Sequence, residues 1–455
     1  MWNFLLETFS GLASGEVAQT SAACFDLAFL VFVLATVAYL VYLAVRRDVF
    51  WRIGIVCGVI AAVSMTLALA LRWIAAGWAP PPFTNLYESL VFFTWGIIVF
   101  YLFVEWRFKI KIAGAFVIPL ACLTMGLASL SPEKGIEPLV PALQSIWLHL
   151  HVMVASIAYA AFLASFAFAV LYFLRDRLQF EWFIAAISGF AVCALPAASK
   201  GALFHGAFVL DKVVLRGGEW LKVEMPGREN VFEQIALPGV GPFLLIALAG
   251  FLAALVMAIH AVWPGTSCAM RSNSPQPNGR APVCGYTLSV FAASFVFLTA
   301  GLILFFIQLA RLPEARLASN PYAFAMLLVV WLGALVVLIA QWRYELLLAA
   351  LPEVKAIDRL TYKTIMVGFP LMTLVIITGA IWANKAWGRY WGWDPKETAS
   401  LVTWIIYLLF LHTRLTQGWI GRRSMLIAVI GFASVVFTYL GVNLLLPGLH
   451  AYATG

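Results

Sequence analysis

The sequence predicts an all-α, polytopic membrane protein with about 12 transmembrane helices. Of its 455 residues, 63% are hydrophobic and only 11% are charged, whereas soluble domains carry about a quarter charged residues. The apolar runs are continuous and about 20 residues long, which is the length that crosses a bilayer as a helix. A transmembrane barrel would instead alternate apolar and polar residues in segments of about ten, so the pattern excludes that class.

Each predicted helix corresponds to one apolar run of the chain. The runs lie at about 27–45, 52–74, 86–104, 112–130, 150–174, 182–199, 241–263, 285–309, 322–348, 363–383, 398–416 and 424–446. The run at 182–199 is the weakest of them. We retain it because the basic clusters near 175 and 355 lie on one side of the membrane only if an even number of spans separates them.

The basic residues indicate how the chain is oriented. Clusters at 46–52, 107–111, 175–177, 271–280, 355–363 and 414–423 hold 16 of the 29 Lys and Arg residues. The positive-inside rule assigns these loops to the cytoplasm and both termini to the outside. The first 26 residues contain no Lys or Arg, so no cleavable signal is expected. The net charge of +8 follows from such loops, and no nucleic-acid partner is predicted.

The sequence divides into three parts. Residues 1–175 form a five-helix N-terminal part, 176–350 an inserted four-helix block, and 351–455 a C-terminal core. The block contains an outer loop at 200–240, whose mixed charge and Gly and Pro turns predict a small strand pair or a lid. A segment at 264–284 is rich in Pro, Ser and Asn, which predicts a flexible linker.

The six cysteines carry no metal or haem-attachment pattern. They occupy positions 24, 57, 122, 193, 268 and 284, and no two of them form a Cys-x-x-Cys pair. We interpret them as small buried hydrophobic residues rather than a disulfide framework or a zinc site. The absence of Cys-x-x-Cys-His also excludes a c-type cytochrome.

A tryptophan-rich segment, Trp387-Gly-Arg-Tyr-Trp-Gly-Trp-Asp-Pro-Lys-Glu-Thr398, joins two of the predicted spans. Indole rings gather at membrane surfaces in any case, so an aromatic belt is the simple alternative. Three tryptophans within seven residues, mixed with both signs of charge, favour a platform for a flat, partly charged ligand. Asp394, Pro395 and Glu397 also have the spacing of a capped helix start.

This segment, the helix ending Tyr-Leu-Leu-Phe-Leu-His412-Thr-Arg and the tail Gly-Val-Asn-Leu-Leu-Leu-Pro-Gly-Leu-His450-Ala-Tyr together resemble the CcsA (ResC) family. Members of that family are haem-handling membrane proteins of system II cytochrome c biogenesis, and the tryptophan segment is their WWD signature. Asn85-Leu-Tyr-Glu-Ser89 and Trp147–Val152 add shorter matches. Two features depart from the family. Ala399-Ser400 replaces the usual Trp-Ala, and the chain between His151 and His412 is longer than in compact members.

The predicted topology sorts the histidines by depth. His151 and His450 lie at outer ends of spans, level with the tryptophan loop, and we expect them to form a bis-imidazole haem site. Two interfacial histidines facing water are the alternative. His149 lies about 200° around the helix from His151, and the family pattern favours His151, which directly precedes a valine.

The resemblance implies a second haem site at His412, which lies roughly 22 Å into its span. There the opposite ligand would come from a CcsB (ResB) subunit, and we interpret His260 as structural. The residues of the tryptophan loop can also be given roles in haem binding. Trp387, Tyr390, Trp391 and Trp393 would contact the porphyrin, and Arg389 and Lys396 the propionates. Pairing of these cations with Asp394 and Glu397 explains the charges equally well, and Asp394 would cap the next helix.

The function that the resemblance implies is a haem lyase (cytochrome c synthase) that works with a CcsB/ResB-like membrane subunit. It would bind haem b transiently, move it outward and attach it to the Cys-x-x-Cys-His thiols of apocytochrome c, with His151 and His450 as the catalytic ligands. The expected location is the bacterial inner membrane, among membrane lipids, with the loop and both termini facing the periplasm. Alternatives are a CcmF-like system I haem lyase, a haem exporter and a b-type electron carrier.

Overall fold

The computed structural model confirms an all-α, multi-pass membrane protein. It describes residues 14–76, 86–130, 145–216, 219–225, 231–263, 283–312, 314–316 and 320–442. These residues contain 12 helices that are long and apolar enough to cross a membrane, one for each predicted run. The weak run is among them, as α7 (Glu181–Ala198). Asn85 and His450 lie outside the described residues.

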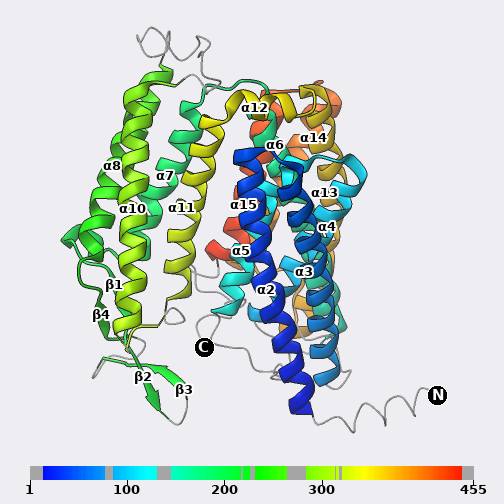
Figure 1. Cartoon of the computed structure of the whole chain (residues 1–455). Helices are drawn as coiled ribbons and strands as arrows, with labels where there is room; N and C mark the ends of the chain where they lie inside the picture. The colour runs from blue at the N-terminus through cyan, green and yellow to red at the C-terminus, as the bar shows by residue number, and fades with distance from the viewer. Residues whose placement is uncertain are drawn as a thin grey trace. The chain divides into compact units, whose positions relative to one another are not determined.

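The chain forms two compact units (Figure 1). Unit 1 comprises Met1–Ser129, Glu133–Asp176 and Ala350–Gly455, and unit 2 comprises Leu130–Pro132 and Arg177–Ala349. The helices of unit 1 are α2 (Ser14–Val45), α3 (Asp48–Ala75), α4 (Leu86–Phe108), the short η1 (Lys111–Ala113), α5 (Gly114–Ser129), α6 (Ile146–Arg175), α13 (Val354–Trp387), α14 (Pro395–Thr416), α15 (Arg422–Val436) and the π-helical turn η5 (Phe437–Gly441). The division of the sequence into the three predicted parts, 1–175, 176–350 and 351–455, with a separate role for each, stays a prediction.

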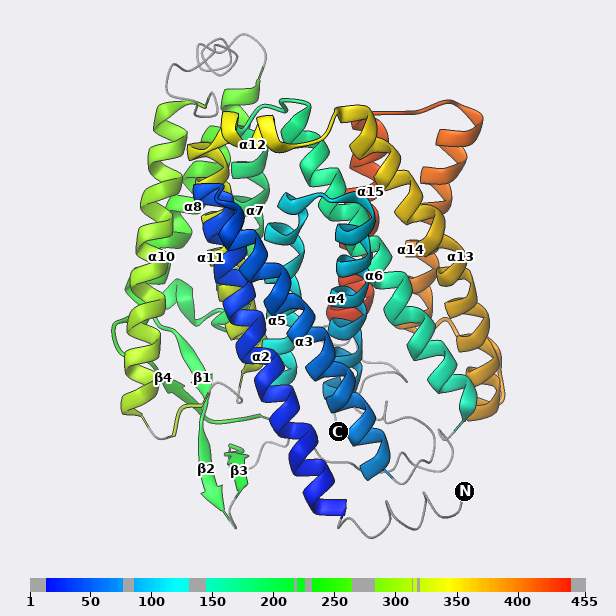
Figure 2. The ribbon, with the colours of Figure 1, turned by 45° about the vertical axis from the view of Figure 1, so that its right-hand side comes forward.

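Helices α6 and α13 run side by side through unit 1 (Figure 2). Their antiparallel register follows from two contacts, because Phe162 of α6 faces Gly368 of α13, and His151 faces Gly379. The Phe162 ring also stacks on Tyr407 of α14, with ring centroids 3.7 Å apart. The Tyr407 ring also lies against Gly431 of α15. Four helices that come from both ends of the sequence therefore share one close-packed centre.

Unit 2 contains α7, η3 (Ala202–His205), α8 (Val240–Val262), α10 (Gly285–Arg311), α11 (Pro321–Trp342) and α12 (Tyr344–Ala350). The predicted run 322–348 is wrong at its end, because α11 stops at Trp342 and α12 begins at Tyr344 as a separate short helix (Figure 1). Arg343, at the break, places its guanidinium 3.9 Å from the Trp342 ring centroid. The break therefore falls where polar side chains interrupt the apolar run.

The 200–240 loop of unit 2 forms two antiparallel strand pairs, which confirms the predicted small sheet. Strand β1 (Val209–Asp211) pairs with β4 (Gln234–Ala236), and β2 (Val213–Arg216) pairs with β3 (Glu219–Lys222). The buried carboxylate of Asp211 forms ion pairs with Lys200 and Lys222. These charges hold the strands together and show no catalytic arrangement.

The cysteine interpretation needs one correction. Cys24, Cys57, Cys122 and Cys193 are free, but Cys284 is disulfide-bonded. Cys284 directly precedes α10, at the end of the predicted linker, so it lies at a chain turn rather than within an apolar helix. Spacing alone did not reveal this bond, because the sequence contains no Cys-x-x-Cys pair.

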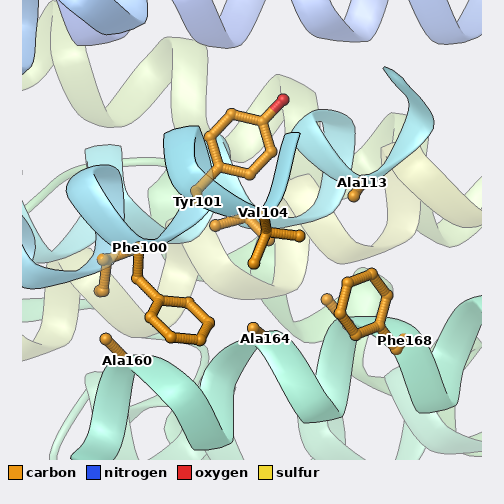
Figure 3. Close-up of a pocket in the computed structure, with 10 residues that line it drawn as sticks. Phe100, Tyr101, Val104, Ala113, Ala160, Ala164 and Phe168 are labelled. Atoms are coloured by element: carbon orange, nitrogen blue, oxygen red, sulfur yellow. The ribbon is translucent and has the colours of Figure 1, made fainter. Parts of the chain in front are cut away.

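A small pocket in unit 1 lies between α4, α5 and α6 (Figure 3). Its lining is almost entirely apolar, and α6 contributes the alanines Ala160, Ala164 and Ala167. The one hydroxyl among the lining residues, that of Tyr101, is hydrogen-bonded to the hydroxyl of Tyr39 at 2.7 Å. The pocket therefore presents no group for acid–base or metal chemistry, and none of the predicted site residues lines it.

Candidate functional site

The tryptophan loop is shorter and more ordered than the sequence segment suggests. Helix α13 continues to Trp387 and ends at Gly388, whose φ of 72° is the left-handed conformation typical of a helix end. Helix α14 begins at Pro395, and the Asp394 side chain accepts a hydrogen bond from the Lys396 amide at 3.2 Å. The predicted capped helix start is confirmed. Residues 388–394 alone connect the two spans.

Trp393 adopts a strained backbone conformation near the end of this loop. Its φ is 56°, which is unusual for a bulky residue, and the residue is 69% exposed. One oxygen of Glu397, Oε2, accepts hydrogen bonds from the amides on either side, Gly392 at 2.7 Å and Asp394 at 3.2 Å. Strain of this kind costs about 1–3 kcal/mol and clusters at functional sites. The Glu397 carboxylate therefore holds the Trp393 ring in its exposed position.

Replacing Glu397 with alanine is expected to release Trp393, because hydrogen bonds to a charged acceptor contribute about 1.5–3 kcal/mol each. Glu397→Gln is the matched control, since its single amide oxygen can accept from both backbone amides. We expect faster proteolysis of the loop and an altered tryptophan emission spectrum in Glu397→Ala but not in Glu397→Gln. Equal behaviour of the two variants would contradict the role given to Oε2.

The aromatic rings of the loop form two edge-to-face pairs. Trp391 and Trp393 have centroids 5.8 Å apart at an angle of 89°. Trp387 packs against Trp382 at 4.8 Å, and Trp382 is only 2% exposed. Tyr390 is exposed. Trp382 and Trp387 both belong to α13, so their contact packs the end of that helix just before the loop, a role of Trp382 that sequence reasoning missed because this residue lies within an apolar run.

The two predicted cations of the loop differ in their surroundings. The guanidinium of Arg389 lies across Gly392, where an added Cβ would be 2.7 Å from Cζ. Within the described part of the chain, no ion pair involves Arg389. Asp394 and Glu397 instead accept hydrogen bonds from backbone amides. Pairing with these carboxylates therefore does not account for Arg389, whereas Lys396 lies half-buried in the first turn beside Asp394.

His151 of α6 is fixed by the backbone of α13. Its Nδ1 lies 2.8 Å from the carbonyl oxygen of Val375. Because a carbonyl oxygen only accepts, Nδ1 carries the proton, and the lone pair of the neutral ring is on Nε2. The ring faces Gly379, which precedes Trp387 by eight residues, or about 12 Å along the helix axis. His151 therefore contacts α13 about two turns before the loop begins, and its predicted level in the membrane stays a prediction.

The structure separates His149 from His151. His149 is buried, and its Nδ1 lies 2.9 Å from the carbonyl oxygen of Ser145 in the preceding turn. The two imidazoles thus have different surroundings, in agreement with their angular separation on a helix. The predicted pairing of His151 with His450 stays a prediction, because His450 lies outside the described residues.

His412 is exposed near the end of α14, on a face that it shares with Ile405 and Leu409. The next two residues turn inward. Thr413 is buried, and Arg414 forms a two-pronged ion pair with Asp358 of α13. His205 and His260 belong to unit 2, where both are exposed. His412 is thus exposed on the surface of unit 1. A histidine with a purely structural role would instead point into the helix bundle.

Comparison with known proteins covers nearly the whole chain. The family model described as "Cytochrome C assembly protein" matches residues 83–450. A cytochrome c biogenesis protein CcsA from Nostoc punctiforme is 31% identical over 396 residues, 86% of each chain. A CcsA from a Synechococcus species is 29% identical over 98% of each chain, so it shares the 176–350 segment.

Among solved structures, the cytochrome c haem lyase CcmF matches 95% of this chain and 72% of its own, with a TM-score of 0.32 at 14% identity. That likeness is too low to carry an argument. The extent of the family match and the level of identity to the CcsA relatives decide the assignment. The chain belongs to the cytochrome c assembly protein family, as a CcsA-type cytochrome c biogenesis protein.

Proposed function

We propose that the protein binds haem b transiently and presents it for covalent attachment to apocytochrome c. The observation that carries this proposal is the state of His151. Its Nδ1–H bond to Val375 leaves the lone pair on Nε2, and a histidine that ligates a metal almost always donates its other ring nitrogen in this way. Val375 belongs to α13, and this helix leads directly into the tryptophan loop.

The loop supplies the other groups that a haem requires. Tyr390, Trp391 and Trp393 offer aromatic surface for the porphyrin, and Trp387 joins them from the end of α13. Arg389, held across Gly392, and Lys396 are suited to the propionates, because guanidinium groups bind carboxylates in a bidentate manner. Asp394 keeps the loop joined to α14. His450 completes the proposed bis-imidazole site.

The attachment itself is chemistry of haem and thiol. Each cysteine thiol of the Cys-x-x-Cys-His motif adds across one vinyl group, so that sulfur bonds to one vinyl carbon and the proton goes to the other. This addition is redox-neutral and needs no further reactant. The histidine of the apocytochrome then displaces one of the two axial ligands. The protein would contribute mainly by holding the reacting groups in position.

The exposed position of His412 supports a membrane partner. An ionisable side chain that faces lipid is costly and is usually functional. We infer that a CcsB/ResB-like subunit covers this face of α14 and supplies the second histidine of an inner haem site. The chain would lie in the bacterial inner membrane with the tryptophan loop and both termini in the periplasm, as its basic clusters indicate.

Co-expression with a CcsB-like partner, in a host that lacks its own maturation pathway, tests the proposal. We expect holocytochrome c, detected by haem staining, and a b-type haem spectrum in the purified complex. His412→Ala removes a proposed ligand and should lower both by more than about 100-fold, because the loss of a residue that only supports a ligand already costs about 10- to 100-fold. His260→Ala, an exposed histidine on α8, is the control and should leave both unchanged. Haem bound without holocytochrome formation would favour the exporter alternative.

A further inference from the structure

We propose that Gly379 is a positioning residue for His151: its missing side chain uncovers the Val375 carbonyl and gives the imidazole the space to bind it. This inference rests on the proposed role of His151 as a haem ligand. The starting observation is the 2.8 Å contact between Nδ1 and the Val375 oxygen, which joins residues 224 positions apart. Val375 itself is buried in the α6–α13 interface.

The Val375 carbonyl has an ordinary partner within its own helix. In an α-helix, the carbonyl of residue i accepts from the amide of residue i+4, which here is Gly379. The hydroxyl of Thr378 donates chiefly to the Leu374 oxygen, at 2.7 Å, and lies 3.2 Å from the Val375 oxygen. A carbonyl oxygen has two lone pairs, so His151 uses the lone pair that the helix amide leaves.

Only glycine permits this approach. A Cβ at position 379 would lie 2.9 Å from both Cε1 and Nδ1 of His151, which is closer than nonbonded carbon atoms approach one another. Any side chain would therefore push the imidazole away from the carbonyl. The lost contact is the one that fixes the proton on Nδ1 and the lone pair on Nε2, so the ring would no longer be held in a single orientation.

A second glycine on α13 provides a built-in comparison. Gly368 faces the Phe162 ring of α6, and a Cβ there would lie 2.7 Å from that ring. Both glycines admit a ring from α6 against the backbone of α13, but only Gly379 admits a titratable one. Gly368→Ala therefore tests the effect of widening the interface between α6 and α13 alone, whereas Gly379→Ala also displaces His151.

The test compares purified full-length Gly379→Ala and Gly368→Ala with wild type by titration with haemin. We expect Gly379→Ala to weaken haem affinity about 10- to 100-fold and to lose the low-spin bis-imidazole absorption spectrum. Gly368→Ala should lower the thermal unfolding temperature while retaining that spectrum. Gly126→Ala in α5, where a Cβ has ordinary contacts at 3.7 Å, controls for the substitution itself.

A further variant keeps the proposal testable if Gly379→Ala does not fold. The double variant Gly379→Ala/His151→Ala removes the imidazole that the added Cβ would meet, so its thermal unfolding temperature should return to that of His151→Ala alone. A double variant that is as unstable as Gly379→Ala, or a wild-type spectrum and affinity in Gly379→Ala, would overturn the proposal. His151→Ala separates the two ideas, because its retention of haem would overturn the proposed function itself.

Discussion

Replacing His151 with alanine is expected to reduce haem retention and the yield of holocytochrome c by more than about 100-fold, because loss of a metal ligand should exceed the 10- to 100-fold effect of losing its supporting hydrogen bond. The substitution removes Nε2 and the bond to Val375 together. The fold should tolerate it. Alanine favours a helix, the side chain is only partly buried, and the Val375 oxygen keeps its helix donor, the amide four residues on.

His149→Ala is the matched control for this prediction. It removes an imidazole two residues away on the same helix, one that is more deeply buried and bonded within its own turn. We expect it to lower the thermal unfolding temperature and to leave the haem spectrum unchanged. Absorption spectra of the purified variants and haem staining of the matured cytochrome measure both effects. A lost spectrum in His149→Ala with a retained one in His151→Ala would exchange the roles of the two residues.

The positions of the membrane spans could be predicted because the bilayer imposes them. A lipid-exposed segment must be apolar over about 20 residues and must satisfy its backbone internally, and all 12 runs became helices. The helix ends could not be predicted in the same way. Helix α2 begins at Ser14 and α13 at Val354, well before the apolar runs at 27 and 363. Hydropathy indicates only the part of a helix that crosses the lipid, whereas the backbone hydrogen bonds continue past it.

The candidate site shows a similar division between local and distant features. The start of α14 was predictable because Asp394, Pro395 and Glu397 act within one turn. The supports of His151 were not, because Val375 and Gly379 meet it only through the packing of α6 on α13. A glycine within an apolar run does not reveal which aromatic or imidazole ring from another helix will pack against it. The place along α13 that His151 contacts follows from the same packing register.

Asp358→Ala is expected to lower the free energy of unfolding by about 3–5 kcal/mol, the cost of leaving one partner of a buried ion pair uncompensated. Asp358 and Arg414 each have a side chain that is only 13% exposed. Both Nη atoms of Arg414 donate to the two carboxylate oxygens, and the amide of Gly421 donates to Oδ1 at 3.2 Å. One carboxylate thus ties α13 to α14 and to the residue before α15.

Chemical or thermal unfolding in detergent measures this effect, and Glu345→Ala provides the control. Glu345 pairs with Arg177 at 3.5 Å, but both side chains are about half exposed, so its loss should cost less than about 1 kcal/mol. Similar losses in the two variants would show that the Asp358–Arg414 pair is solvated and contributes little. Asp358→Asn should fall between, because its amide oxygen can still accept from Gly421.

The same pair also determines where His412 points. Arg414 is two residues from His412, and its inward bond to Asp358 fixes the rotation of the last turns of α14, which leaves His412 on the opposite, exposed face. Replacing both partners by leucine removes the buried charges together, so most of the stability should return. The ion pair between α13 and α14 remains absent in this double variant. We therefore expect haem binding at the proposed His412 site to stay low, whereas the spectrum of the proposed His151 site recovers. Full recovery of both would show that the pair acts on stability alone.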